Sequence, residues 1–74
     1  MTVYISPNPG KPMAYGISQR AAQILMAHGA KVLMQMNLRE ECTTMGVQFL
    51  PQNECLEKTD VILTIGGDGT ILHE

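Results

Sequence analysis

An apolar run that ends in a cluster of glycines constrains the fold of this sequence more than any other feature. Residues 61–65 read Val-Ile-Leu-Thr-Ile, and glycines follow at positions 66, 67 and 69, interrupted by Asp68. A short run of mostly β-branched apolar residues predicts a strand that is buried on both faces. The glycines end that strand, and they let a ligand approach the main chain without meeting a Cβ atom.

The residues after the glycines predict the start of a helix. Thr70 opens a second apolar segment, which continues with Ile71 and Leu72. Open α/β sheets bind ligands where the carboxyl end of a strand turns towards the amino end of a helix. We therefore expect a nucleotide to lie along the backbone of Gly66, Gly67, Asp68, Gly69 and Thr70.

The alternative is a β-hairpin in which Asp68-Gly69 forms a tight turn between residues 63–65 and 71–73. A two-residue hairpin does not require further glycines at positions 66 and 67, so we prefer the ligand-binding turn.

Asp68 restricts the chemistry of this turn. A plain phosphate-binding loop usually carries a lysine after its glycines, and no lysine follows here. Two like unit charges about 4 Å apart cost roughly 1 to 4 kcal/mol at effective dielectric constants of about 80 to 20. Asp68 should therefore face either a hydroxyl group that loses its proton or a divalent metal that neutralises phosphates. Both belong to phosphoryl transfer from a nucleotide to an alcohol.

Residues 61–72 resemble the Gly-Gly-Asp-Gly-Thr signature of NAD kinases, which use ATP or polyphosphate to phosphorylate NAD to NADP. Diacylglycerol and sphingosine kinases share the signature, and phosphofructokinases carry a looser form. The Ile71-Leu72 pair is more similar to NAD kinases than to the Val-Asn-Glu typical of lipid kinases. A weaker resemblance extends over all 74 residues.

The resemblance implies roles for individual residues. Asp68 would accept the proton of the adenosine ribose 2′-hydroxyl, and Gly69 would lie beside the NAD, with a divalent metal such as Mg²⁺ present. Asn8 is a candidate nucleotide contact because NAD and lipid kinases both have an asparagine-proline pair at this place. The alternative for Asn8 is a turn residue that binds its own backbone. His73 is a candidate phosphate contact or an ordinary surface histidine.

Three functional hypotheses follow from these residues. The first is part of an NAD kinase, homo-oligomeric in its full-length form. The second is the catalytic domain of a lipid kinase, in which the same glycines would bind ATP. The third is a nucleotide-binding fragment without activity.

The length and composition favour one partial domain. A chain of 74 residues, 45% hydrophobic and 16% charged, is globular in composition but rich in apolar residues, so we expect covering surface to be missing. NAD kinases are considerably longer. We therefore interpret residues 1–74 as the partial amino-terminal α/β nucleotide-binding domain of such an enzyme, inactive when isolated.

The net charge argues against two classes of partner, and the cysteine spacing indicates the redox state of the thiols. The net charge of −2 supports neither nucleic-acid binding nor binding to anionic membranes, and no targeting segment or membrane span is present. A cytoplasmic location follows. Cys42 and Cys55 form no Cys-x-x-Cys pattern, so we expect reduced, structural thiols.

The remaining pattern predicts a Rossmann-like β-α-β unit with parallel strands. Residues 2–6 form its first strand, and residues 31–36 form its second. Pro12 suits the first turn of the connecting helix, although Gly16 makes Ser18 an alternative N-cap, and Gly29 ends the helix. The apolar face of the helix is expected to comprise Ile17, Ala21, Ile24, Leu25 and His28.

The rest of the sequence is less regular. Asn37 is expected to cap a short helix that runs through Thr44, residues 47–50 are expected to be extended, and residues 53–58 are expected to form one helical turn. The methionines at positions 26, 34 and 36 are expected to fill the core.

Overall fold

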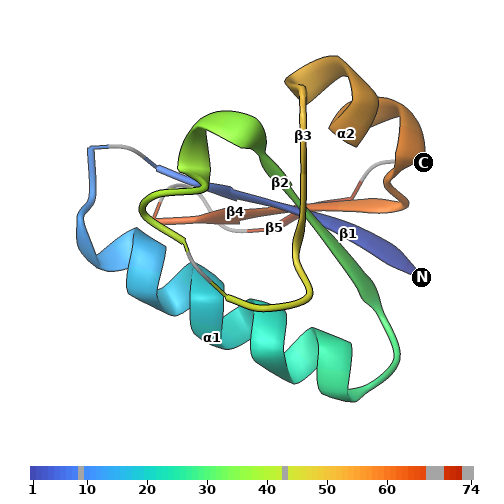
Figure 1. Cartoon of the computed structure of the whole chain (residues 1–74), viewed down its shortest axis with the longest axis horizontal. Helices are drawn as coiled ribbons and strands as arrows, with labels where there is room; N and C mark the ends of the chain where they lie inside the picture. Colours follow the sequence, from blue (N-terminus) through green and yellow to red (C-terminus); the bar gives the residue numbers. More distant parts are fainter. Residues whose placement is uncertain (9, 43, 67–69, 73–74) are drawn as a thin grey trace.

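A single sheet with helices on both of its faces makes up the fold (Figure 1). The computed structural model describes residues 1–8, 10–42, 44–66 and 70–72, the last three through their backbone. The strands are β1 (Thr2–Pro7), β2 (Lys31–Gln35), β3 (Gln48–Leu50), β4 (Val61–Ile65) and β5 (Thr70–Leu72). The helices are α1 (Met13–Ala27), the 3₁₀ turn η1 (Met36–Leu38) and α2 (Gln52–Lys58).

The strands are arranged in the order β3-β2-β1-β4-β5. β1 lies in the centre and pairs in parallel with β2 on one side and with β4 on the other. β2 in turn pairs in parallel with β3, whereas β5 is antiparallel to β4. The predicted α/β class and the parallel β-α-β unit are therefore confirmed.

Strands β1 and β2 contribute core side chains on both faces of the sheet, because successive side chains of a strand point to opposite sides. On the face that α1 covers, Val3 and Ile5 of β1 pack with the neighbouring side chains of β2 and α1. On the face that α2 covers, Tyr4 and Leu33 pack with Cys55. Figure 1 shows α1 below the sheet and α2 above it.

The buried face of α1 differs from the predicted one. Ala14, Ser18 and Ala22 are buried, whereas Ile17 and Ile24 are 50% and 54% exposed. These three small residues recur every four positions and therefore form one stripe, and their size lets the helix backbone lie close to the sheet. Ala21 and Leu25 pack against the core as predicted. The prediction is wrong for Ile17 and Ile24, because the apolar residues of α1 occupy two faces, and for His28, which is exposed.

The ends of α1 correct one expectation and confirm another. The alternative N-cap at Ser18 is wrong, because the helix begins at Met13 and runs through Gly16. Pro12 precedes it with a φ of −56°, the value that its ring imposes. At the other end Gly29 has a φ of +88°, as predicted for a left-handed cap, and His28 donates from Nδ1 to the carbonyl oxygen of Ile24 (2.8 Å).

The segment between β2 and β3 is mostly a loop. The predicted helix through Thr44 is wrong: a single 3₁₀ turn, η1, is followed by a turn in which the Cys42 amide donates to the Leu38 carbonyl oxygen (2.8 Å). Gln19 of α1 holds this loop, since its Nε2 donates to the carbonyl oxygen of Glu41 (3.2 Å) and its Oε1 accepts from the Thr44 hydroxyl (3.3 Å). A loop that Gln19 holds by side-chain hydrogen bonds therefore stands where the local pattern predicted a helix.

Of the three methionines expected in the core, Met34 is fully buried and Met26 packs against the core. Met36 is 48% exposed, so its assignment to the core is wrong. Met36 is the first residue of η1, where the chain leaves the sheet. The alternation of side chains along β2 therefore no longer determines whether Met36 faces the core.

The short elements before β4 follow the sequence more closely. Residues 48–50 are extended as expected, and α2 covers seven residues rather than a single turn. Thr59 and Asp60 then fasten the start of β4 to that of β1: the Asp60 amide donates to the Thr2 carbonyl oxygen, and Asp60 Oδ2 accepts from the Thr2 amide (2.9 Å).

Cys42 and Cys55 are buried and free, as expected for structural thiols. Burial raises the pKa of both thiols, because desolvation disfavours the thiolate. The Cys55 thiol donates weakly to the Met34 carbonyl oxygen (3.5 Å). Both residues therefore act as small core side chains rather than as nucleophiles.

The segment around the glycines departs from the prediction in two ways. β4 is half-buried along its length, not buried on both faces. Thr70–Leu72 is strand β5 rather than a helix start, with Leu63 paired to Thr70 and Val61 to Leu72. An edge strand such as β4 offers unpaired backbone groups with which a short apolar segment can pair. The alternative of a β-hairpin is confirmed in its antiparallel pairing, but its two-residue turn is wrong, since residues 64–69 separate the innermost pair.

Ser18 supplies a test of the packing of α1. Its side chain is completely buried, and among the described residues its hydroxyl oxygen has no hydrogen-bond partner. An unpaired buried hydroxyl costs about 1 to 3 kcal/mol. We predict that Ser18→Ala raises the free energy of unfolding by about 1 kcal/mol, measured by urea denaturation. Gln23→Ala is the control, because it brings a similar gain in helix propensity of a few tenths of a kcal/mol without removing a buried group. A loss of stability in Ser18→Ala would show that the hydroxyl is paired.

Candidate functional site

The order in which the chain adds strands to the sheet reverses between β1 and β4. From β1 the chain crosses through α1 to β2 on one side, and it later returns through α2 to β4 on the other side (Figure 1). In open α/β sheets, the crevice outside the carboxyl ends of two such strands is the usual ligand site. The candidate site therefore lies beyond Pro7 of β1 and Ile65 of β4, which are paired in the register.

Asn8 joins the two strand ends at this edge. Its backbone amide donates to the carbonyl oxygen of Ile65 (2.8 Å), and its Nδ2 donates to the carbonyl oxygen of Gly66 (3.4 Å). Its Oδ1 accepts from the Gly10 amide (2.9 Å), which closes the turn after β1. The asparagine turn and the first glycine of the motif thus lie side by side, as the parallel strands predicted. Asn8 also accepts a hydrogen bond within its own turn, so both interpretations of this residue, a nucleotide contact and a turn residue, are compatible with its geometry.

Gly66 occupies a position that strongly favours glycine. Its φ is +83°, a conformation that residues with a Cβ atom rarely adopt. A Cβ atom at this position would lie 3.1 Å from Cβ of Ala14 and 3.2 Å from Cβ of Lys11. The start of α1 therefore packs directly against the end of β4, and the small side chain of Ala14 permits this close approach.

The remaining predicted site residues are distributed as follows. Gly67, Asp68, Gly69 and His73 lie outside the described residues, and Thr70 is placed by its backbone as the first residue of β5. Asn8 and Gly66 are the two predicted residues that the structure brings together.

Sequence reasoning missed Lys11. It is exposed, and its Cβ and Cγ atoms lie beside Gly66, although the two residues are far apart in the sequence. The available signal was its place in the Pro-Asn-Pro-Gly-Lys-Pro turn directly before a helix, at the carboxyl end of a strand.

No group of three or more histidine, cysteine, aspartate or glutamate side chains that could hold a metal occurs among the described residues. Similarly, no helix in the described part of the chain is long and apolar enough to cross a membrane.

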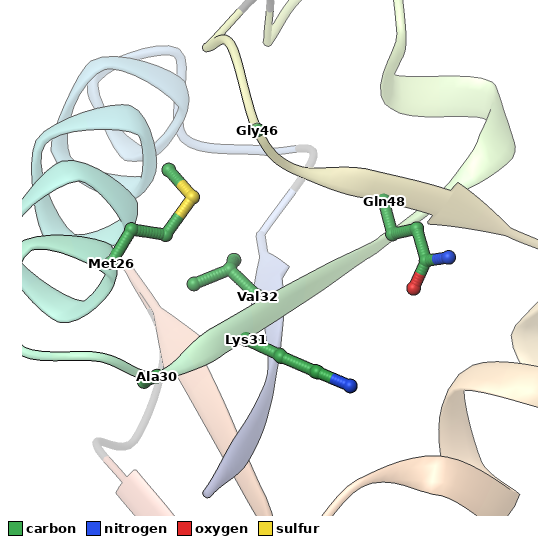
Figure 2. Close-up of a pocket in the computed structure, with 6 residues that line it drawn as sticks. All are labelled: Met26, Ala30, Lys31, Val32, Gly46 and Gln48. Carbon is green, nitrogen blue, oxygen red and sulfur yellow. The ribbon is translucent and has the colours of Figure 1, made fainter.

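A second concave region lies at the opposite edge of the sheet, at the amino ends of β2 and β3 (Figure 2). This hollow of about 380 Å³ is lined by Met26, Ala30, Lys31, Val32, Gly46 and Gln48. Met26 points towards Gly46, whereas the polar ends of Lys31 and Gln48 point away from it (Figure 2). The polar groups therefore do not converge on a ligand position in this hollow.

The strand order and the helices on both faces define a doubly wound α/β domain with Gly66 at its switch point. Residues 3–74 match the family described as the ATP-NAD kinase N-terminal domain. The chain therefore belongs to the NAD kinase family. A relative named NAD kinase, from Halorhodospira halophila (strain DSM 244 / SL1), is 33% identical over 73 residues, which cover 97% of this chain and 24% of that protein. The chain thus spans about a quarter of the length of this relative. No solved structure matches the chain.

Substitution of Gly66 tests the junction between β4 and α1. Gly66→Ala should lower the free energy of unfolding by about 1 to 3 kcal/mol, because it combines a strained φ with contacts to Ala14 and Lys11. Urea denaturation of the purified variants measures the effect.

Two other glycines separate the causes. At Gly29, with a φ of +88°, an added Cβ meets nothing within 4 Å, so Gly29→Ala reports backbone strain alone. Gly16 lies inside α1 with open space around it, so Gly16→Ala should stabilise by about 0.5 to 1 kcal/mol. Equal losses for Gly66→Ala and Gly29→Ala would show that the contacts with α1 contribute nothing.

Proposed function

We propose that these residues form part of an NAD kinase, which transfers a phosphoryl group from ATP or polyphosphate to the adenosine ribose 2′-hydroxyl of NAD and releases NADP. The family match over residues 3–74 carries the proposal. It is supported by the position of Gly66 and Asn8 outside the carboxyl ends of two adjacent parallel strands, where the nucleotide would lie.

Asp68 acts as the acceptor of the hydroxyl proton in this proposal. It follows Gly66 by two residues in the sequence. A free aspartate has a pKa of about 3.9 and is a weak base at neutral pH, so its main contribution is to orient the hydroxyl for attack. Proton transfer of this kind contributes about 10²- to 10⁴-fold in rate.

The backbone amides of Gly66, Gly67, Gly69 and Thr70 line the nucleotide in this proposal, with Asn8 and His73 as further contacts. A divalent metal, Mg²⁺, neutralises the donor phosphates. Mg²⁺ usually keeps several waters and is held largely by substrate phosphates, so the donor phosphates would hold it without a cluster of protein ligands.

The full-length enzyme is proposed to act in the cytoplasm as a homo-oligomer on soluble nucleotides, without nucleic-acid or membrane partners. Residues 1–74 supply one wall of its site, and we propose that they are inactive when isolated.

The role of Asp68 is tested in the full-length enzyme. Asp68→Asn removes the proton acceptor and keeps the shape of the side chain, so turnover should fall by at least about 10²-fold while nucleotide affinity changes less than about tenfold. Steady-state kinetics and equilibrium nucleotide binding measure the two quantities. Undiminished turnover in the purified variant would remove Asp68 from the mechanism.

The acceptor is tested by presenting labelled ATP with NAD in solution and, in parallel, with diacylglycerol or sphingosine in micelles. We expect label in NADP, dependent on a divalent metal, and none in the lipid. Label in the lipid alone would assign this glycine turn to a lipid kinase and overturn the proposed function.

A further inference from the structure

The glycine motif is followed by no lysine, and Lys11 is the lysine that the structure places against its first glycine, Gly66. We propose that Lys11 binds the phosphate groups of the phosphoryl donor, a nucleoside triphosphate or a linear polyphosphate, from the turn between β1 and α1. This inference rests on the proposed function and adds a contact residue to the same site.

The position of the side chain is the first argument. The Cβ and Cγ atoms of Lys11 lie 3.2 and 3.4 Å from the point that a Cβ atom of Gly66 would occupy. The aliphatic stem therefore packs on the first glycine of the motif, while the residue as a whole stays exposed. A lysine that buries its stem in this way keeps its ammonium group in solvent.

The turn that carries Lys11 is held in place by hydrogen bonds. The Lys11 amide donates to the Asn8 carbonyl oxygen (3.0 Å), and Asn8 is bonded to both Ile65 and Gly66. The backbone of Lys11 is thus fixed relative to the glycine turn. A fixed backbone lowers the entropy lost when the side chain binds an anion.

The distribution of charge is the second argument. The sequence has five lysines and arginines, and Lys11 is the one that contacts Gly66. Lys31 and Lys58 lie at the opposite edge of the sheet, since they precede or begin strands, and Arg39 lines a different hollow together with Glu40. Arg20 lies in the middle of α1 rather than at its start, so Lys11 is the basic residue that the structure places against Gly66.

The surroundings of Lys11 leave its ammonium group available to a ligand. Among the described residues it forms no ion pair and donates no side-chain hydrogen bond. The first turn of α1, which begins two residues later, contains no acidic residue and has no side-chain cap. The positive end of the helix dipole adds to the charge of Lys11 and favours an anion at this place.

A lysine in this turn also resolves the charge conflict that Asp68 creates. A lysine directly after the glycines, as in other phosphate-binding loops, would neutralise a carboxylate within the same loop. Supplied from a separate turn, the cation binds the donor while the carboxylate remains free to orient the acceptor hydroxyl.

The test uses the full-length protein and three variants. Lys11→Met keeps the apolar stem on Gly66 and removes the charge, Lys11→Arg keeps the charge, and Lys31→Met removes an exposed lysine at the opposite edge as a matched control. Calorimetry measures binding of inorganic tripolyphosphate, and steady-state kinetics measure KM for ATP and for NAD. Circular dichroism checks that all variants are folded.

We expect Lys11→Met to weaken tripolyphosphate binding and to raise KM for ATP about tenfold or more, with KM for NAD within about twofold. Lys11→Arg should restore most of both, and Lys31→Met should match the wild type. Unchanged tripolyphosphate binding in Lys11→Met, or no binding by the wild type, would overturn the inference. A wild-type protein that binds tripolyphosphate through Lys11 but does not phosphorylate NAD would overturn the proposed function and support the phosphate contact.

Discussion

The parallel pairing of β1 with β4 is the constraint on which the rest of the structure depends. Its register runs from Val3 opposite Val61 to Pro7 opposite Ile65, so both strands end at the same level. That ending places the asparagine turn beside Gly66, and the same pairing brings the start of α1 onto the end of β4. Because β2 lies on the other side of β1, the crossover connections leave in opposite directions and open a crevice between the strand ends.

Close packing of α1 on the sheet follows from residue size. Ala14, Ser18 and Ala22 form the buried stripe, and the larger Ile17 and Ile24 point outwards. A stripe of bulky residues would hold the helix farther from the sheet and would separate Lys11 from Gly66. The high apolar content of the sequence is therefore only partly used in the core, and the exposed isoleucines account for some of the apolar excess that the composition indicated.

Local patterns predicted the central strands and the end of α1 because those features depend on nearby residues: β-branched runs in β1 and β4, and a glycine at position 29. The predictions failed where distant contacts decide the outcome. Gln19 binds the loop at Glu41 and Thr44, which no local pattern shows, and β5 forms because β4 offers a free edge. The same limit applied to the site: sequence spacing indicated Gly66 and Asn8, but the contact between Lys11 and Gly66 exists only in three dimensions.

The separation of opposite charges between two loops has a physical consequence for phosphoryl transfer. A carboxylate and an ammonium group in one glycine loop would pair with each other, and each would then be less available to a substrate. Here Asp68 follows β4 in the sequence, whereas Lys11 lies in the turn after β1, which Asn8 joins to Gly66. In the proposed function the donor phosphates lie beside the lysine and the acceptor hydroxyl beside the aspartate, so each charge acts on a different reactant. The proposed cation then comes from a different turn than the proposed carboxylate, and the pairing of β1 with β4 brings the Lys11 turn against Gly66.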